Sequence, residues 1–212
     1  LRFEQGHLDE AERLAHEALE GAGPDLRGAS HALVEAHLVL AGVATERLDL
    51  DRAEQWAERA VEVASDHGVP LHQMLAAAAL VTAYEARHGA EAALTAFARP
   101  VRLAIASPHL DARLDQLRAE LEVLAGRIDD GERRIAGLPL TFGRSLVAAR
   151  IALARGRSAK AADLLADPPA GLPLRWTIER ALLLHEARPG DTRRQREAFA
   201  LASDHGFRWT VQ

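Results

Sequence analysis

The tripeptide Ser-Asp-His, whose side chains are those of a hydrolase relay, occurs twice in this sequence. The copies are Ser65-Asp66-His67 and Ser203-Asp204-His205. Consecutive side chains of a helix point about 100° apart, so one copy cannot bring its hydroxyl, carboxylate and imidazole together. Gly68 and Gly206 follow the copies, which is typical of helix ends that place histidine at the negative end of the helix dipole. The pattern therefore favours two helix ends over a hydrolase site.

The ten histidines raise the question of a metal site. No His-x-x-x-His or His-Glu-x-x-His spacing occurs. His31 and Glu35 are expected on one helical face, and so are His72 and Ala76, but neither set supplies three convergent ligands. Cysteine is absent, which excludes thiolate zinc sites, a cysteine nucleophile and disulfides. The sequence predicts no metal site and no cofactor.

Acid–base and nucleotide chemistry are also not indicated. Glu54 and Glu58 lie one turn apart on a solvated helical face, and general acid–base catalysis would need a partly apolar cleft. The only lysine, Lys160, follows Ala159, so the chain has no Gly-x-x-x-x-Gly-Lys phosphate loop. We therefore expect no catalytic residue, and we predict that the chain is not an enzyme.

The amino-acid composition limits which classes of protein remain possible. Of the 212 residues 48% are apolar, 27% charged and only 4% aromatic, which favours packed helices over sheets. The net charge is −5, and the chain lacks the basic stripe of a nucleic-acid surface. No apolar stretch approaches the roughly 18 residues that span a bilayer, and no signal peptide is visible. We expect a cytoplasmic chain that contacts neither membrane nor nucleic acid.

Two internal repeats indicate the architecture. Gly137-Leu138-Pro139-Leu140 recurs 34 residues later, and the segment 64–68 recurs 138 residues later, about four such steps. Apolar residues recur at helical spacing in eleven segments. These segments are 8–20, 31–47, 51–67, 71–88, 90–106, 111–126, 129–136, 143–155, 158–166, 173–187 and 192–205. Only 207–211 shows the alternation of a strand.

The period of 34 and the small residues indicate tetratricopeptide-like hairpins. Ala41, Ala53 and Ala60 occupy positions where two helices approach closely, and Gly156 begins a Gly-x-x-x-x-Ala corner. Leu48 stands where the pattern has glycine. The sequence predicts an all-α, right-handed superhelical array of antiparallel helix hairpins, about five plus a half unit, in a single α-solenoid domain over 1–212.

Two stretches resemble a known family. The segments 50–60 and 196–208 are similar to lines in the helical region of LuxR/MalT-type transcriptional regulators. The resemblance implies a tetratricopeptide-like sensor region between an N-terminal ATPase module and a C-terminal helix-turn-helix. This chain has neither a phosphate loop nor a helix-turn-helix after residue 206. We therefore expect no ATP hydrolysis or specific DNA binding by this segment. Because the sequence begins with Leu1 and not Met, we also expect an excised piece of a longer protein.

The leading hypothesis is a sensor module that binds a small-molecule effector, protein or peptide in a concave groove lined by the first helix of each hairpin. The alternative is a tetratricopeptide scaffold of an unrelated multidomain protein, and a small helical hydrolase is a distant third. Candidate binding residues are polar positions in the first helices. They are Glu35, His72, Gln73, Arg113, Gln116, Arg144 and Arg175.

Two of these candidates suggest a ligand class. Arg144 and Arg175 lie 31 residues apart, close to one repeat, so they are placed to face one groove and to favour an anionic ligand. A plainer alternative pairs Arg175 with Glu179 at i,i+4.

The first helix carries one further expectation. Its apolar stripe loses its natural first-helix partner at the start of the chain, so we expect an exposed apolar surface and a weak homodimer of the fragment. The stripe consists of Leu8, Ala11, Leu14, Ala15, Ala18 and Leu19.

Overall fold

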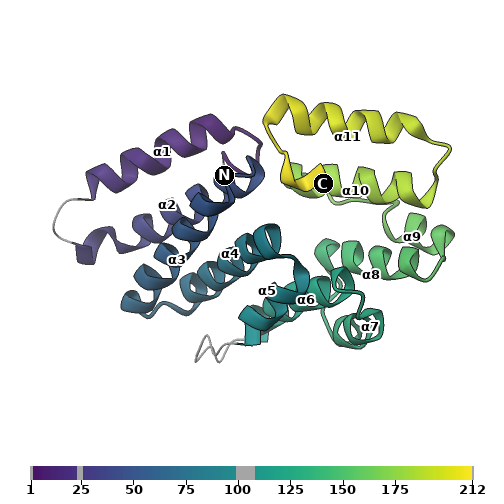
Figure 1. Ribbon diagram of the computed structural model, residues 1–212, viewed down its shortest axis with the longest axis horizontal. Helices are drawn as coiled ribbons and strands as arrows, with labels where there is room; N and C mark the ends of the chain where they lie inside the picture. Colours follow the sequence, from purple (N-terminus) through teal and green to yellow (C-terminus); the bar gives the residue numbers. More distant parts are fainter. Residues whose placement is uncertain (1, 23–25, 99–107, 212) are drawn as a thin grey trace. The chain divides into compact units, whose positions relative to one another are not determined.

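The computed structural model describes residues 2–22, 26–98 and 108–211, and over these residues the chain is all-helical, without strands. The helices run in antiparallel hairpins (Figure 1). Each of the eleven predicted helices is present. Their bounds are α1 (Leu8–Gly21), α2 (Leu26–Glu46), α3 (Leu50–His67), α4 (Pro70–His88), α5 (Ala90–Ala98), α6 (Pro108–Leu124), α7 (Ile128–Ala136), α8 (Phe142–Ala154), α9 (Ser158–Leu164), α10 (Leu174–Ala187) and α11 (Thr192–His205).

The strand-like alternation at 207–211 does not form a strand. Gly206 adopts a left-handed conformation (φ 75°), and the Phe207 N–H donates to the Ala202 carbonyl at 2.8 Å. This bond ends α11 and turns the chain, and the ring of Phe207 is buried at 2% exposure. The chain then forms a short 3-10 helix, η1 (Trp209–Val211). The second half of the predicted helix 90–106 lies outside the described residues.

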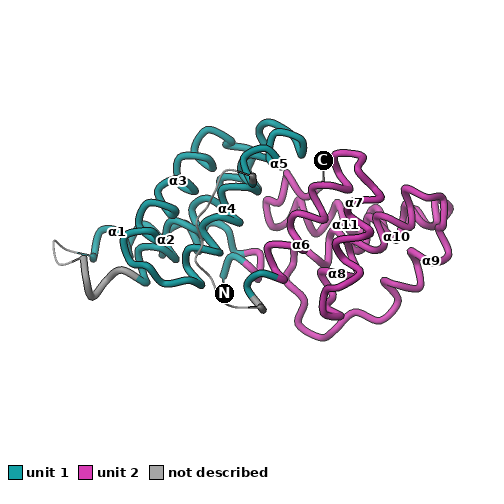
Figure 2. The backbone as a smooth tube through the Cα atoms, turned by 90° about the horizontal axis from the view of Figure 1, so that it is seen from below, with its two compact units in different colours: residues 1–3, 7–111 teal, residues 4–6, 112–212 magenta. Residues whose placement is uncertain are grey.

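The chain divides into two compact units (Figure 2). Unit 1 comprises residues 1–3 and 7–111, and unit 2 comprises residues 4–6 and 112–212. No helix within the described ranges is long and apolar enough to cross a bilayer.

Unit 1 is held together by a row of alanines on α3. Ala53, Ala57, Ala60 and Ala64 recur every three or four residues and are completely buried. The row packs against α2 and α4, which contact each other as well as α3. Because alanine side chains are short, the three helix backbones approach closely, and α2 and α4 come to share one face.

Unit 2 repeats this plan with larger side chains. Its main apolar cluster joins α8, α9 and α10 through Leu146, Ala161, Leu165 and Leu183, all buried. The segment 4–6 also belongs to this unit, because the Leu174 N–H donates to the Glu4 carbonyl at 2.9 Å.

Leu48, which stands where the pattern has glycine, lies in a left-handed turn between two helices, as glycines do at other corners. Gly126 and Gly156 end α6 and α8 with φ of 78° and 69°, and Leu48 has φ of 63° after α2. The Asp49 N–H donates across the corner to the Ala44 carbonyl at 2.9 Å. Leucine therefore adopts a conformation that glycine accepts without strain.

The expectation of an exposed stripe on the first helix is wrong for most of its residues. Leu8, Ala11 and Ala15 are at most 5% exposed, and Ala18 and Leu19 pack with α2 in the cluster around Leu40. The helix that follows in sequence, α2, packs against this part of the stripe. Leu14 remains 42% exposed.

Candidate functional site

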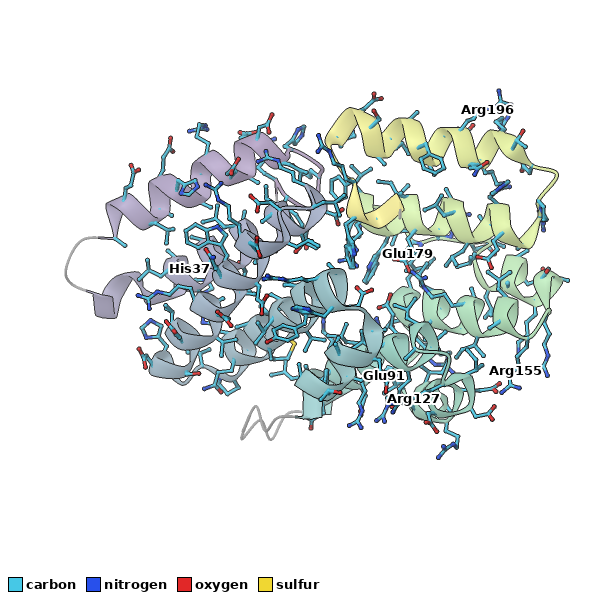
Figure 3. All side chains as sticks on the ribbon, viewed as in Figure 1. His37, Glu91, Arg127, Arg155, Glu179 and Arg196 are labelled. Atoms are coloured by element: carbon cyan, nitrogen blue, oxygen red, sulfur yellow. The ribbon has the colours of Figure 1, made fainter. Side chains whose placement is uncertain are left out.

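The first helices of the hairpins, α2 and α4 in unit 1 and α6, α8 and α10 in unit 2, carry polar side chains in both units. Figure 3 draws these side chains on the ribbon. Three groups stand out, one in unit 1 and two in unit 2.

The group in unit 1 is a cluster of two imidazoles and a carboxylate, here called the His–Glu cluster: His31, Glu35 and His72. His31 Nδ1 lies 2.6 Å from His72 Nε2, and the ring centroids are 4.5 Å apart. One ligand atom from each of the three residues lies within 4.8 Å of the others. His31 and Glu35 are exposed, whereas His72 is only 6% exposed.

This cluster overturns part of the sequence analysis. The expectation that no three ligands converge is wrong, because α2 supplies His31 and Glu35 one turn apart and α4 supplies His72 beside them. Each helix alone offers too few ligands, as expected, but the two sets combine.

The surroundings of His72 favour the neutral form of its imidazole. Burial is the main cause that lowers the pKa of His72, and the neighbouring His31 lowers it further, while Glu35 opposes the shift. The Nδ1 of His72 has no hydrogen-bond partner among the described residues, and the same holds for the buried Nε2 of His67. The polar contact of His72 is therefore the one between its Nε2 and His31 Nδ1.

The second group, the acid–arginine network, consists of Glu120, Arg150 and Glu179 from α6, α8 and α10. Arg150 Nη2 lies 2.7 Å from Glu179 Oε1 and 3.7 Å from Glu120 Oε1. Burial and the Glu179 carboxylate raise the pKa of Glu120, although Arg150 and Arg175 oppose the change. Glu179 lies between α10 and α8 (Figure 3). The network joins three successive hairpins.

Arg175 is positioned by the end of the chain. Its guanidinium carbon lies 4.3 Å from the centroid of the Trp209 ring in η1, a cation–π contact. The sequence could not show this partner, since the alternation of this segment predicts a strand. Glu179, the alternative partner considered for Arg175, pairs with Arg150.

The third group is a hollow of about 270 Å³ formed by α7, α8 and α9. Its floor is apolar, with Ile135, Ile151 and Leu164, and its rim carries cationic side chains. These are Arg144, Arg157 and Lys160, accompanied by Glu132. Because the basic groups outnumber the acid, the hollow fits an anion with an apolar body.

Arg144 is held in place at the rim by its neighbours. Its Nε donates to the Ile135 carbonyl at 2.9 Å, and its backbone N–H donates to Thr141 Oγ1, which caps α8. Thr141 Oγ1 also donates to Gln116 Oε1 at 3.2 Å. The structure therefore brings Gln116 and Arg144 to one place, whereas Arg175 contacts η1.

The remaining candidates have less defined surroundings. Arg113 is exposed on α6, and Gln73 is half-buried on α4 beside His72.

The sequence patterns did not reveal a set of ion pairs that recurs, among the described residues, at the corners after α2, α4 and α8. Each links an arginine at the end of a first helix to two acids at the start of the preceding second helix. These corner ion pairs join Arg47 to Asp9 and Glu12, Arg87 to Asp51 and Glu54, and Arg155 to Asp129 and Glu132. Their sequence signal is Asp-x-Ala/Gly-Glu or a close variant at the start of α1, α3 and α7. At α9 the corresponding residues are Ala159 and Ala162, and Lys160 adds a cation there.

Unit 1 has a hollow as well, of about 170 Å³, between α1, α2 and α3. Trp56 lines it, with the rings of His16 and His37 at 6.0 and 5.6 Å from the indole. Burial lowers the pKa of His37, whose Nδ1 contacts the Leu33 carbonyl at 2.6 Å.

Comparison with protein-family models, with curated proteins and with solved structures found no match for this chain.

Proposed function

We propose that this chain is a ligand-sensing module that binds a small anionic effector in the hollow of unit 2. The observation that carries the proposal is the combination of an apolar floor with Arg144, Arg157 and Lys160 at the rim. A carboxylate or phosphate would accept charge-assisted hydrogen bonds there, while an attached apolar group would contact Ile151 and Leu164.

The wider setting belongs to the same proposal. The residues that resemble LuxR/MalT-type regulators support a sensor region that couples effector binding to attached ATPase and helix-turn-helix domains in the cytoplasm. The 34-residue period and the left-handed corners support a right-handed superhelix of tetratricopeptide type. A scaffold for protein–protein interaction in an unrelated protein is the alternative.

The binding proposal is tested by calorimetric titration with hexanoate, benzoate and inorganic phosphate. We expect the two organic anions to bind more tightly than phosphate, because only they contact the apolar floor. Lys160→Gln and Arg157→Gln should each weaken binding by about tenfold, since one charge-assisted hydrogen bond contributes about 1.5 kcal/mol.

The matched control is Arg193→Gln. This side chain is exposed on α11, where it pairs with Glu197, so its loss changes the net charge equally without touching the hollow. Equal weakening by the control would mean that non-specific charge drives binding and would contradict the proposal. So would the absence of saturable binding of all three anions.

The regulatory setting is tested on the complete coding sequence. A phosphate loop upstream and a helix-turn-helix downstream would support the sensor, and their absence would favour the scaffold.

A further inference from the structure

The His–Glu cluster has the composition of a transition-metal site. Two imidazole nitrogens and a carboxylate form the ligand set found in many zinc and non-haem iron proteins. The three side chains come from two helices that are already packed together by the alanine row of α3. Convergence of this kind therefore needs no rearrangement of the backbone.

The burial of His72 is the second observation. A buried imidazole usually has hydrogen bonds from the protein at both nitrogens or binds a metal. The Nε2 of His72 faces His31 Nδ1 at 2.6 Å, and no hydrogen bond within the described residues engages its Nδ1. Packing therefore holds this side chain, and its Nε2 is directed at His31.

We infer that His31, Glu35 and His72 bind a divalent transition metal of the zinc class, which connects α2 to α4. The three protein ligands leave a fourth tetrahedral position for water or for an oxygen of a small ligand. His31 and Glu35 are exposed, so the ion can enter from solvent. The inference is independent of the anion site proposed for unit 2.

The geometry requires one small adjustment. Two nitrogens on a tetrahedral zinc ion lie about 3.3 Å apart when each bond is about 2.0 Å, so the imidazoles have to separate from their 2.6 Å contact. His31 is exposed and can rotate about its side-chain bonds, whereas His72 stays fixed by its burial. Glu35, one turn further along α2, then completes the set.

The experiment titrates the metal-free 212-residue chain with Zn²⁺ by calorimetry and with Co²⁺ by visible absorption. We expect one ion per chain and a Zn²⁺-dependent rise in Tm, because the ion links two helices of the folded state. His31→Asn should weaken binding by more than about 100-fold and Glu35→Gln by at least about tenfold, since even outer partners of metal ligands contribute about 10–100-fold.

Both variants change exposed residues, so circular dichroism should show an unchanged fold. His88→Asn is the matched control, since His88 is also on α4 and its Nε2 lies 3.6 Å from Glu54, without a second imidazole. It should bind Zn²⁺ as the unchanged chain does.

Three results would overturn the assignment. One is the absence of saturable binding of one Zn²⁺, and another is equal affinity of the unchanged chain and His31→Asn. A loss in His31→Asn without a loss in Glu35→Gln would remove the carboxylate from the ligand set. The first two results would reduce the cluster to a pair of hydrogen-bonded imidazoles, and the third would contradict the three-ligand site.

Discussion

Unit 1 and unit 2 each place polar side chains on their first helices, but the chemistry differs. The His–Glu cluster of unit 1 contains two imidazoles, the side chains that most often bind metals in proteins. The acid–arginine network of unit 2 is built around Arg150, whose guanidinium stays charged at all relevant pH values. The first helices thus hold a pair of imidazoles in one unit and a permanently charged guanidinium between two carboxylates in the other. A pair of imidazoles is suited to bind a metal ion, and the guanidinium to hold helices together.

The largest effect should follow from breaking the network in unit 2. Arg150→Met would leave Glu179, whose side chain is 9% exposed, without its guanidinium partner. We expect a loss of about 3 kcal/mol in the free energy of unfolding, measured by urea denaturation.

The matched control replaces all three charges at once, as Glu120→Gln, Arg150→Met and Glu179→Gln. This variant should recover most of the loss, because no buried charge remains uncompensated. A loss as large as that of Arg150→Met alone would show that packing of the arginine stem, and not charge, is responsible.

The effect of pH on the free energy of unfolding should be the next largest. Its sign should be opposite in the two units. The pKa values of His72 and His37 are lowered from 6.5 in the folded chain. Below about pH 6.5 the unfolded chain therefore binds more protons, and unit 1 loses stability as the pH falls. The pKa of Glu120 is raised from 4.5. The folded chain keeps that proton longer, so unit 2 loses stability as the pH rises above 4.5.

Urea unfolding at about pH 7.5 and about pH 5.5, with a chelator present, measures both effects. The stabilising effect of Glu120→Gln should be greater at the higher pH, because the unchanged chain must bury a charge there. The destabilising effect of His37→Gln should be smaller at the lower pH, where burial disfavours the charged imidazole of His37 in the folded chain. Differences that are independent of pH would contradict this assignment.

The corners provide the third comparison. Gly126 has φ of 78°, and the space that a Cβ would occupy there is open, so Gly126→Ala should cost about 1 kcal/mol through backbone strain alone. Leu48→Gly should stabilise the chain, because it relieves the same kind of strain. The loss of the apolar contacts of the leucine side chain reduces this gain. Thermal unfolding measures both, and a destabilised Leu48→Gly would mean that those contacts outweigh the strain.

The smallest effect is expected at the corner ion pairs. Arg47→Gln removes contacts to Asp9 and Glu12 and should cost about 0.5 kcal/mol, decreasing at high salt. Arg13→Gln, which breaks an exposed pair with Glu17 on one helix, is the control and should cost less. If both variants lose the same stability at all salt concentrations, the corner pairs have no special contribution.

The helices and the corners could be predicted from the sequence because their signals are local. Apolar spacing defines a helix within about 15 residues, and the position of Leu48 follows from the tetratricopeptide pattern, in which glycine ends the first helix. The end of the chain could not be predicted in this way. The alternation after Gly206 is typical of a strand, but the burial of Phe207 and the turn of the backbone favour η1.

The candidate sites depend on contacts that the repeat length alone does not reveal. Arg144 and Arg175 are 31 residues apart, yet the first contacts Ile135 and the second contacts Trp209. His31 and His72 are 41 residues apart and meet because α2 and α4 share a face. A search for ligands on one helix at a time misses such a cluster.

The corner ion pairs give the hairpin α2–α3 a direction. It offers Arg47 to the helix before it, α1, and Asp51 with Glu54 to the hairpin after it. If a second copy of residues 26–67 followed the first, the arginine of the copy would contact Asp51 and Glu54 of the first. The two acids of the copy would contact Arg87. The charges at the two ends of such a hairpin are complementary. Hairpins of this kind can therefore be duplicated along a gene, in the same orientation, without a new junction being designed.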